Sequence, residues 1–418
     1  MALFSPQLQR LFISNYECNR SSSTATKNVI IPSKGRGGRC CSAIAIDAPS
    51  SSLSNVVRWG SALVQGAREE MEDDLVVVQS SEDLGGFSFA AVFDGHAGFS
   101  SVKFLRNELY KECVVALQGG LLLKDKGLDT VKKALEEAFA SADGKLLTWL
   151  ESSAEEVESG STATVILIGD KLMIIAHVGD SSVVSSCTLC DFCFSVRGSE
   201  HRLMRFIVLF LKVLSRSGKA EVLTNSHRPY GRDQTSLQEI RRVREAGGWI
   251  NNGRICGDIA VSRAFGDMRF KTKKNEMLEK GVKEGRWSEK FVSRVQFSGD
   301  LVTAVPDVSQ VALGSDAECA ILASDGLWDY ISSSDAIDFI RNQLQQHGDV
   351  QRACEALAQK ALDQGSQDNI SIVVADFGQT DWSRVAIQQQ NVVVELVQAL
   401  ATLGLVSFGI WLTSQINF

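Results

Sequence analysis

Three residues able to take part in chemistry follow one alternating apolar stretch. The stretch FSFAAVF is followed directly by Asp94, Gly95 and His96. Such alternation predicts a half-buried strand, but Asp-Gly after a strand is also a common turn. Asp94 therefore indicates chemistry only if other carboxylates meet it in space.

Further acidic residues stand where other predicted strands begin or end. They are Glu72, Asp73, Asp180, Asp325 and Asp368, and each adjoins an apolar run that would fix its backbone. Mg²⁺ and Mn²⁺ prefer several carboxylate oxygens. Two such ions about 4 Å apart can activate water and hold a phosphate. Each acid alone is more often a solvated loop residue, so it is the joint pattern that predicts metal-dependent phosphoryl chemistry.

Patterns typical of other chemistries are missing from the chain. There is no HExxH, no spaced His/Cys set for zinc and no GxxxxGK[ST] phosphate loop. The formal net charge of −7 disfavours a nucleic-acid partner. The length of 418 residues allows one large domain or two smaller ones. The ten cysteines are scattered and do not suggest a secreted disulfide scaffold.

Hydrophobic periodicity predicts an α+β fold. The strongest hairpin signal is TATVILIGDKLMIIAHVGD, with its turn at Gly169-Asp170. Antiparallel hairpins combined with separate helix pairs favour this class. Helices are expected over 101–117, 129–150 and 235–248, and as a pair between about 334 and 362.

Seven motifs resemble, in order, those of the protein phosphatase 2C family of metal-dependent Ser/Thr phosphatases. They are REEMEDD (68–74), VFDGHAG (92–98), SGSTA (159–163), HVGDS (177–181), GDIAVSRAFGD (257–267), ASDGLWD (323–329) and SQDNIS (366–371). The resemblance implies a four-layer α/β/β/α sandwich of two antiparallel sheets flanked by helices. It also implies hydrolysis of phospho-Ser or phospho-Thr with two Mg²⁺ or Mn²⁺ ions, and a third in some members.

The resemblance assigns the metal ligands residue by residue. Asp73 and Asp94 would bind directly, with Asp94 bridging the two ions. Glu72 would act through a bound water, and Gly95 would offer its carbonyl because a side chain there would obstruct the approach. The set would be completed by Asp325 and Asp368.

The remaining roles are also implied by the resemblance. Asp180, with Asp329, is similar to a third and weaker metal site. Arg68 would hold the substrate phosphate, and His96 would protonate the departing Ser or Thr oxygen. The nucleophile would be a hydroxide bridging the two ions. The family often carries Arg where Ser182 stands here, a difference that removes no ligand.

The N-terminal region has a composition of its own. Residues 1–46 hold six basic residues, one acid (Glu17) and many Ser and Thr, without a central apolar run. This profile is typical of an organellar transit peptide, and a plain disordered tail is the alternative. We therefore expect an organellar transit peptide and linker over 1–54, which the resemblance implies is a chloroplast transit peptide, and the catalytic domain over 55–382.

The C-terminal region is predicted to cross a membrane. Residues 396–413 contain no charged side chain, and the apolar segment 391–413 is long enough for one span. The alternative is an amphipathic helix packed on the domain, but the apolar residues surround the helix rather than forming one stripe. A transmembrane helix over 391–413 is expected.

These two ends, with the core between them, are similar to those of thylakoid-associated members of the family. That resemblance implies a chloroplast thylakoid membrane protein whose catalytic domain faces the stroma. Its partners would be phosphorylated light-harvesting complex II antenna proteins, dephosphorylated during state transitions. The alternatives are other chloroplast phosphoproteins as substrates, or an inactive phosphatase fold that serves as a binding module.

Residues 185–213 interrupt the predicted hairpin that follows Asp180. The segment contains Cys187, Cys190 and Cys193, but no nearby fourth ligand completes a zinc or iron–sulfur loop. Its residues are those with thymine-rich codons, as in plant introns, so we interpret it as an insertion from a retained intron or a wrongly assigned gene structure. Such an insertion could misplace Asp180.

The segment between Asp267 and Pro306 is longer than the resemblance leads us to expect. It is basic and helical in pattern. We expect it near the mouth of the site, where it could select substrates, and a solvated helix without that role is the alternative.

Overall fold

The computed structural model describes residues 57–125, 127–153, 158–187 and 219–383. All of them lie in one of the two units into which the chain divides, Leu53–Phe418. The predicted transit peptide and transmembrane helix fall outside these residues. Within the described part of the chain, no helix combines the length and apolar character needed to cross a membrane.

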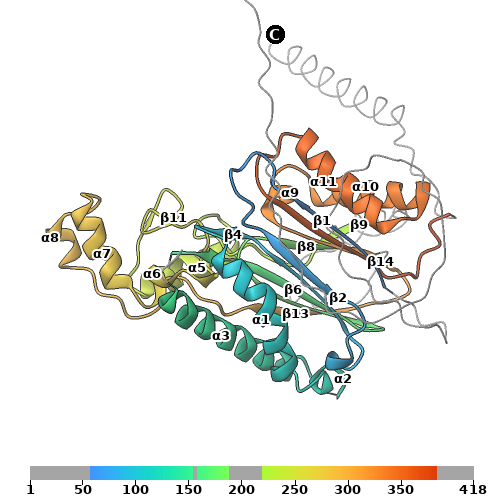
Figure 1. The fold of residues 1–418 in the computed structure, drawn as a ribbon, viewed down its shortest axis with the longest axis horizontal. Coiled ribbons are helices and arrows are strands. Elements are labelled where there is room, and N and C mark those ends of the chain that lie inside the picture. Colours follow the sequence, from blue (N-terminus) through green and yellow to red (C-terminus); the bar gives the residue numbers. More distant parts are fainter. Residues whose placement is uncertain (1–56, 126, 154–157, 188–218, 384–418) are drawn as a thin grey trace, which may run out of the picture. The chain divides into compact units, whose positions relative to one another are not determined.

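Two five-stranded antiparallel sheets form the centre of the fold (Figure 1). The first has the order β13-β7-β6-β3-β2, built from Asp307–Ala312, Leu172–Val178, Ala163–Ile168, Ser88–Phe93 and Asp74–Val78. The second has the order β1-β15-β14-β8-β9, built from Arg58–Val64, Ile370–Asp376, Ala317–Ala323, Ser182–Cys187 and Lys219–Val222. The hairpin predicted at Gly169-Asp170 is confirmed as β6 and β7.

Strand β3 shows why the sheets lie between helices. Its side chains point alternately to opposite faces, as in any strand. Phe89 and Phe93 join one core cluster with α1 (Ser100–Ala116) and α3 (Leu128–Ser152). Ala90 and Val92 join another cluster with strands β14 and β15 of the second sheet. Both faces of β3 are buried, which explains its nearly continuous apolar sequence.

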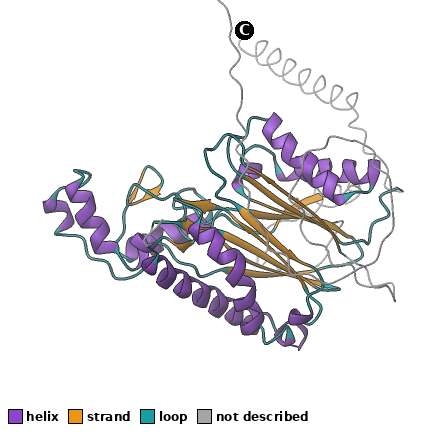
Figure 2. Cartoon of the chain, viewed as in Figure 1, coloured by secondary structure: helices purple, strands orange, loops and turns teal. Residues whose placement is uncertain are grey.

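The second sheet is covered on its outer face by another helix pair. Helices α10 (Ser333–His347) and α11 (Val350–Asp363) share a core cluster with β1, β14 and β15. Each begins at a side-chain cap: Ser332 accepts from the Asp335 amide and Asp349 from the Arg352 amide. Figure 2 shows the resulting order of helix, sheet, sheet, helix. The predicted four-layer α+β sandwich is therefore confirmed.

The segment after β9 forms a subregion with its own small core (Figure 1). Its helices are α5 (Gln234–Glu245), α6 (Met268–Lys271), α7 (Lys274–Lys283) and α8 (Glu289–Val292), with the short hairpin β10 (Ile250–Asn251) and β11 (Arg254–Ile255). The basic stretch between Asp267 and Pro306 is thus three short helices. Trp287 packs directly over Gly281 of α7, where a Cβ would lie 2.3 Å from its ring.

Strand β8 continues three residues into the predicted insertion. Ser185–Cys187 pair with β14 on one side and with β9 on the other. The interruption of the hairpin therefore begins after Cys187, and the rest of the segment 185–213 lies outside the described residues.

The remaining elements are short. They are η1 (Glu82–Leu84), α2 (Leu121–Asp125), α9 (Asp325–Trp328), and the three-stranded sheet of β12 (Phe265–Gly266), β5 (Gly160–Ser161) and β4 (Gly95–His96).

Candidate active site

Strand register brings the predicted acids to one end of the sandwich. In the first sheet the start of β2 pairs with the end of β3, as Asp74 lies opposite Phe93. Strand β6 then places the end of β7 at the same edge, because Ala163 pairs with Val178. In the second sheet the end of β14 pairs with the start of β15. The residues that follow or precede these ends are Asp73, Asp94, Asp180, Asp325 and Asp368.

Three of these carboxylates form a cluster able to hold a metal ion. Each of Asp94, Asp180 and Asp325 places a carboxylate oxygen within 4.8 Å of those of the other two. Asp94 and Asp180 follow β3 and β7 of the first sheet, and Asp325 opens α9 just after β14 of the second sheet, so the cluster draws on both sheets. Oxygen donors at this density are the set that hard divalent cations prefer.

The inner pair of the site is Asp73 and Asp94. Asp73 is only 4% exposed, and its Oδ2 accepts from the Ser371 hydroxyl at 2.6 Å. Burial raises the pKa of Asp73 to about 6, against the opposing effect of that hydrogen bond. Burial, followed by the charges of Asp73 and Asp325, raises the pKa of Asp94 well above its ordinary value. The described residues form no ion pair with either carboxylate. A bound cation would therefore stabilise the charged forms of these neighbouring carboxylates.

Three outer carboxylates, Asp180, Asp325 and Asp329, lie around the guanidinium of Arg228. Arg228 Nε donates to Asp180 Oδ2 at 3.0 Å, and its Nη2 lies 3.5 Å from Asp325 Oδ2. Asp329 Oδ1 is 3.7 Å from the same Nη2. Burial and then Asp180 raise the pKa of Asp325 to about 7. The predicted third-site pair, Asp180 and Asp329, is therefore brought together.

Asn369 ties the loop that carries Glu72 to the start of β15. Its Oδ1 accepts from the Glu72 amide at 2.7 Å, and its Nδ2 donates to the carbonyls of Gln65 and Glu70. The Glu72 carboxylate accepts from the Gly98 amide. Gly95 lies so close that a Cβ there would be 2.3 Å from the Glu72 carbonyl oxygen. The glycine is thus required by this backbone contact, independently of any ligand role.

Arg68 lies at the rim of the site. Its Nη2 donates to Asp368 Oδ2 at 2.7 Å, and the side chain is 59% exposed. The guanidinium predicted to hold phosphate therefore pairs with a predicted metal ligand. An exposed pair of this kind is weakly held, so Arg68 is free to turn to a phosphate.

His96 is paired with a residue to which the sequence analysis gave no role, Asp267. His96 Nε2 and Asp267 Oδ2 are 2.9 Å apart, and Asp267 is buried. A Cβ on Gly160 would lie 2.3 Å from His96 Nε2, so the glycine of SGSTA makes room for the pair. Burial lowers the pKa of His96, but the Asp267 carboxylate outweighs it and leaves the pKa raised.

Two residues of the site were thus missed from sequence, Asp267 and Arg228. Asp267 ends the motif GDIAVSRAFGD, which was quoted without assigning a role to its last residue. Arg228 lies in SHRPYG, outside every quoted motif, and only its contacts with three predicted ligands reveal it.

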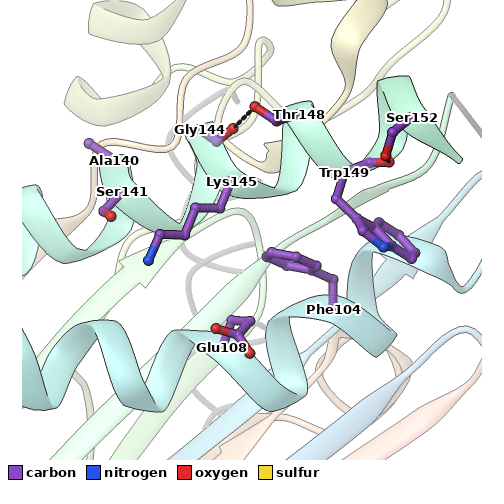
Figure 3. A pocket seen from close by; sticks show the side chains of 9 residues that line it. All are labelled: Phe104, Glu108, Ala140, Ser141, Gly144, Lys145, Thr148, Trp149 and Ser152. Atoms are coloured by element: carbon purple, nitrogen blue, oxygen red, sulfur yellow. Dashed lines mark hydrogen bonds between the residues drawn. The ribbon is translucent and has the colours of Figure 1, made fainter.

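A separate hollow of about 590 Å³ lies between α1 and α3 (Figure 3). Phe104 and Glu108 of α1 face Lys145 and Trp149 of α3 across it. None of the predicted site residues lines this hollow, so it is separate from the acidic site.

Comparison with known proteins identifies the class. The sequence profile of the family "Protein phosphatase 2C" matches residues 58–187 and 212–370. "Protein phosphatase 2C 57" of Arabidopsis thaliana is 56% identical over 423 aligned positions, covering 100% of both chains. "Probable protein phosphatase 2C 27" of Oryza sativa subsp. japonica is 27% identical and covers 81% of this chain and 82% of the relative.

Solved structures agree on the fold. The serine-threonine phosphatase 2C from Toxoplasma gondii superposes with a TM-score of 0.56 at 19% identity, over 78% of this chain and 96% of that one. A C. elegans sex determining protein gives 0.55 at 20%, over 78% and 67%. The chain belongs to the protein phosphatase 2C family and is a protein Ser/Thr phosphatase. Divalent metal ions are the cofactors of this family.

Proposed function

We propose that the chain hydrolyses phospho-Ser and phospho-Thr in proteins with Mg²⁺ or Mn²⁺ held by the clustered carboxylates. The observation that carries the proposal is the crowding of Asp94, Asp180 and Asp325 within 4.8 Å. Asp73, Asp368 and the Gly95 carbonyl would complete the set that holds two ions, and Glu72 would act through water. When bound, such ions polarise a phosphoryl group and lower the pKa of a water nucleophile.

Arg68 would bind the substrate phosphate, and His96 would protonate the leaving group. Arg68, released from Asp368, offers a planar fork of N–H donors that matches two phosphate oxygens. His96 stays protonated to higher pH because Asp267 stabilises its cation. It can therefore give a proton to the leaving Ser or Thr oxygen, which is a poor leaving group without one.

The test is hydrolysis of a phosphothreonine peptide by the purified chain, with added Mg²⁺ or Mn²⁺ and with excess chelator. Activity is expected only with metal. Full activity in chelator would contradict the proposal.

We further propose that the protein acts at the chloroplast thylakoid membrane, facing the stroma, on phosphorylated light-harvesting complex II antenna proteins. Support comes from the basic, Ser-rich composition of residues 1–46 and the uncharged run 396–413. A phosphatase anchored beside its substrates would return the antenna to photosystem II in state transitions.

Two experiments test the location and the substrate. Alkaline carbonate washing of isolated thylakoids should leave the full chain in the membrane and release a version ending at Gln390. Equal release of both would contradict the anchor. Added to phosphorylated thylakoids, the enzyme should remove phosphate from antenna proteins faster than from other stromal-side phosphoproteins, and equal rates would favour a broader substrate range.

A further inference from the structure

Arg228 sits where the outer carboxylates converge. Its side chain is 24% exposed and contacts Asp180, Asp325 and Asp329, all within 3.7 Å. These three acids include both residues of the predicted third metal site. The chain thus supplies a positive charge of its own at the position where that ion is expected.

A pair of hydrogen bonds between Gly179 and His227, one of them to the His227 ring, fixes Arg228 opposite Asp180. The His227 amide donates to the Gly179 carbonyl at 2.8 Å, and the Gly179 amide donates to His227 Nδ1 at 3.1 Å. Asp180 and Arg228 are the next residues on the two segments. The His227 ring is buried, and its Nε2 is 3.0 Å from Asp307 Oδ2 on β13. The backbone at Arg228 is therefore held, and only the side chain can swing away.

A guanidinium and a metal ion cannot both occupy the same carboxylate oxygens at contact distance. The Nε of Arg228 donates a hydrogen bond to Asp180 Oδ2, one of the carboxylate oxygens that the outer site offers to a metal ion. By contrast, the inner pair forms no ion pair with any described residue. Competition by Arg228 is therefore confined to the outer carboxylates.

We propose that Arg228 is an internal cation that competes with a divalent ion for Asp180, Asp325 and Asp329. It keeps these carboxylates together when the outer site is empty and sets the metal concentration at which that site fills. The inference rests on the proposed function, since it requires that the carboxylates bind metal. Arg228 is a positioning residue in this account and does not touch the substrate.

The test is Mn²⁺ binding by the full chain, followed by calorimetry and by the electron paramagnetic resonance of free Mn²⁺. Arg228→Gln should bind its weakest Mn²⁺ at least about tenfold more tightly than wild type, or about 1.4 kcal/mol. Its melting temperature in EDTA should fall, because three carboxylates lose their counterion. Arg228→Lys keeps the positive charge but loses the planar set of guanidinium N–H donors. It should therefore bind Mn²⁺ more tightly than wild type, but by a smaller factor than Arg228→Gln.

Arg232→Gln is the matched control. It removes an exposed positive charge four residues away, on the same segment, and should leave Mn²⁺ binding at the wild-type value. If the control changes as much as Arg228→Gln, general charge explains the effect and the proposal is wrong.

Unchanged or weaker Mn²⁺ binding in Arg228→Gln overturns the proposal. Unchanged Mn²⁺ binding combined with weaker inhibition by inorganic phosphate would assign Arg228 to the substrate instead. If Arg228→Gln does not fold, Arg228→Lys decides, and binding equal to wild type overturns the proposal. Failure of wild type to bind any Mn²⁺ would refute the proposed function itself, a result distinct from all of these.

Discussion

The inner pair and the outer carboxylates are adjacent, yet their negative charges are compensated differently. Asp73 is buried and Asp94 half-buried, and burial with the neighbouring negative charges raises the pKa values of both, although the Ser371 hydroxyl partly stabilises the Asp73 carboxylate. Asp180 and Asp329 lie beside the Arg228 guanidinium, and Asp329 is 57% exposed. Asp325 is intermediate between the two sets, since it contacts Arg228 and burial still raises its pKa to about 7. The inner pair is therefore destabilised until a cation enters, whereas Asp180 and Asp329 already have one. This difference predicts tight, essential metal binding inside and weak, adjustable binding outside.

The largest effect is expected from Asp94→Asn. Neutralising this residue should lower kcat by at least about a hundredfold, because a charged ligand at the reacting centre is lost. The same change should raise the melting temperature in EDTA, because it removes one of several crowded negative charges. Steady-state kinetics and thermal denaturation measure the two effects. A variant that is inactive and also less stable without metal would contradict the strain assigned to the inner pair.

A second effect concerns the strand that leads to the outer carboxylates. His177 of β7 is buried, and burial followed by the His227 ring lowers its pKa from 6.5 to about 3. Between those values the unfolded chain binds a proton that the folded chain does not. Stability is therefore full above pH 6.5 and falls as pH drops, by about 2 kcal/mol at pH 5.

Urea unfolding of wild type and of His177→Gln at pH 7.5 and pH 5 tests this. Both proteins need excess chelator, so that metal release does not contribute. The variant should lose about 2 kcal/mol less than wild type between the two pH values. An identical loss in both would show that His177 does not titrate on unfolding.

A third effect concerns Asp267, which positions His96. Asp267→Asn should slow hydrolysis of a phosphothreonine peptide by about tenfold or more, because the proton donor loses its orientation and the support of its charge. Hydrolysis of an aryl phosphate, whose leaving group needs no proton, should change little. Equal losses on both substrates would show that Asp267 is structural rather than linked to proton donation.

The smallest effect is expected from Asp329→Asn. This carboxylate is mostly exposed and 3.7 Å from Arg228, so at saturating Mn²⁺ the kcat should stay within about threefold of wild type. The Mn²⁺ concentration for half-maximal activity should rise. A loss as large as that of Asp94→Asn would abolish the distinction between the inner and outer sets.

Much of the fold was predictable because its strands are buried on one or both faces. The apolar composition of the run SFAAVF and of the hairpin TATVILIGDKLMIIAHV predicts buried strands. The spacing of apolar residues in α1 and α3 predicts helices with one buried face. The basic stretch after Asp267 was less predictable. Its helical character was predicted, but its division into three short helices and the return of Trp287 onto Gly281 of α7 were not, because such packing is not encoded by local propensity.

The sequence by itself singled out a set of acids as candidate ligands, since Asp73, Asp94, Asp180, Asp325 and Asp368 each lie within two residues of a strand end. Antiparallel register in two sheets then decided that these ends meet, because only pairing brings Val178 and Phe93 to one edge. The partners of the site came from tertiary structure alone. Asp267 reaches His96, and Arg228 reaches Asp180, across 171 and 48 residues of chain. Contacts over such separations depend on the packed fold and leave no periodic trace in the sequence.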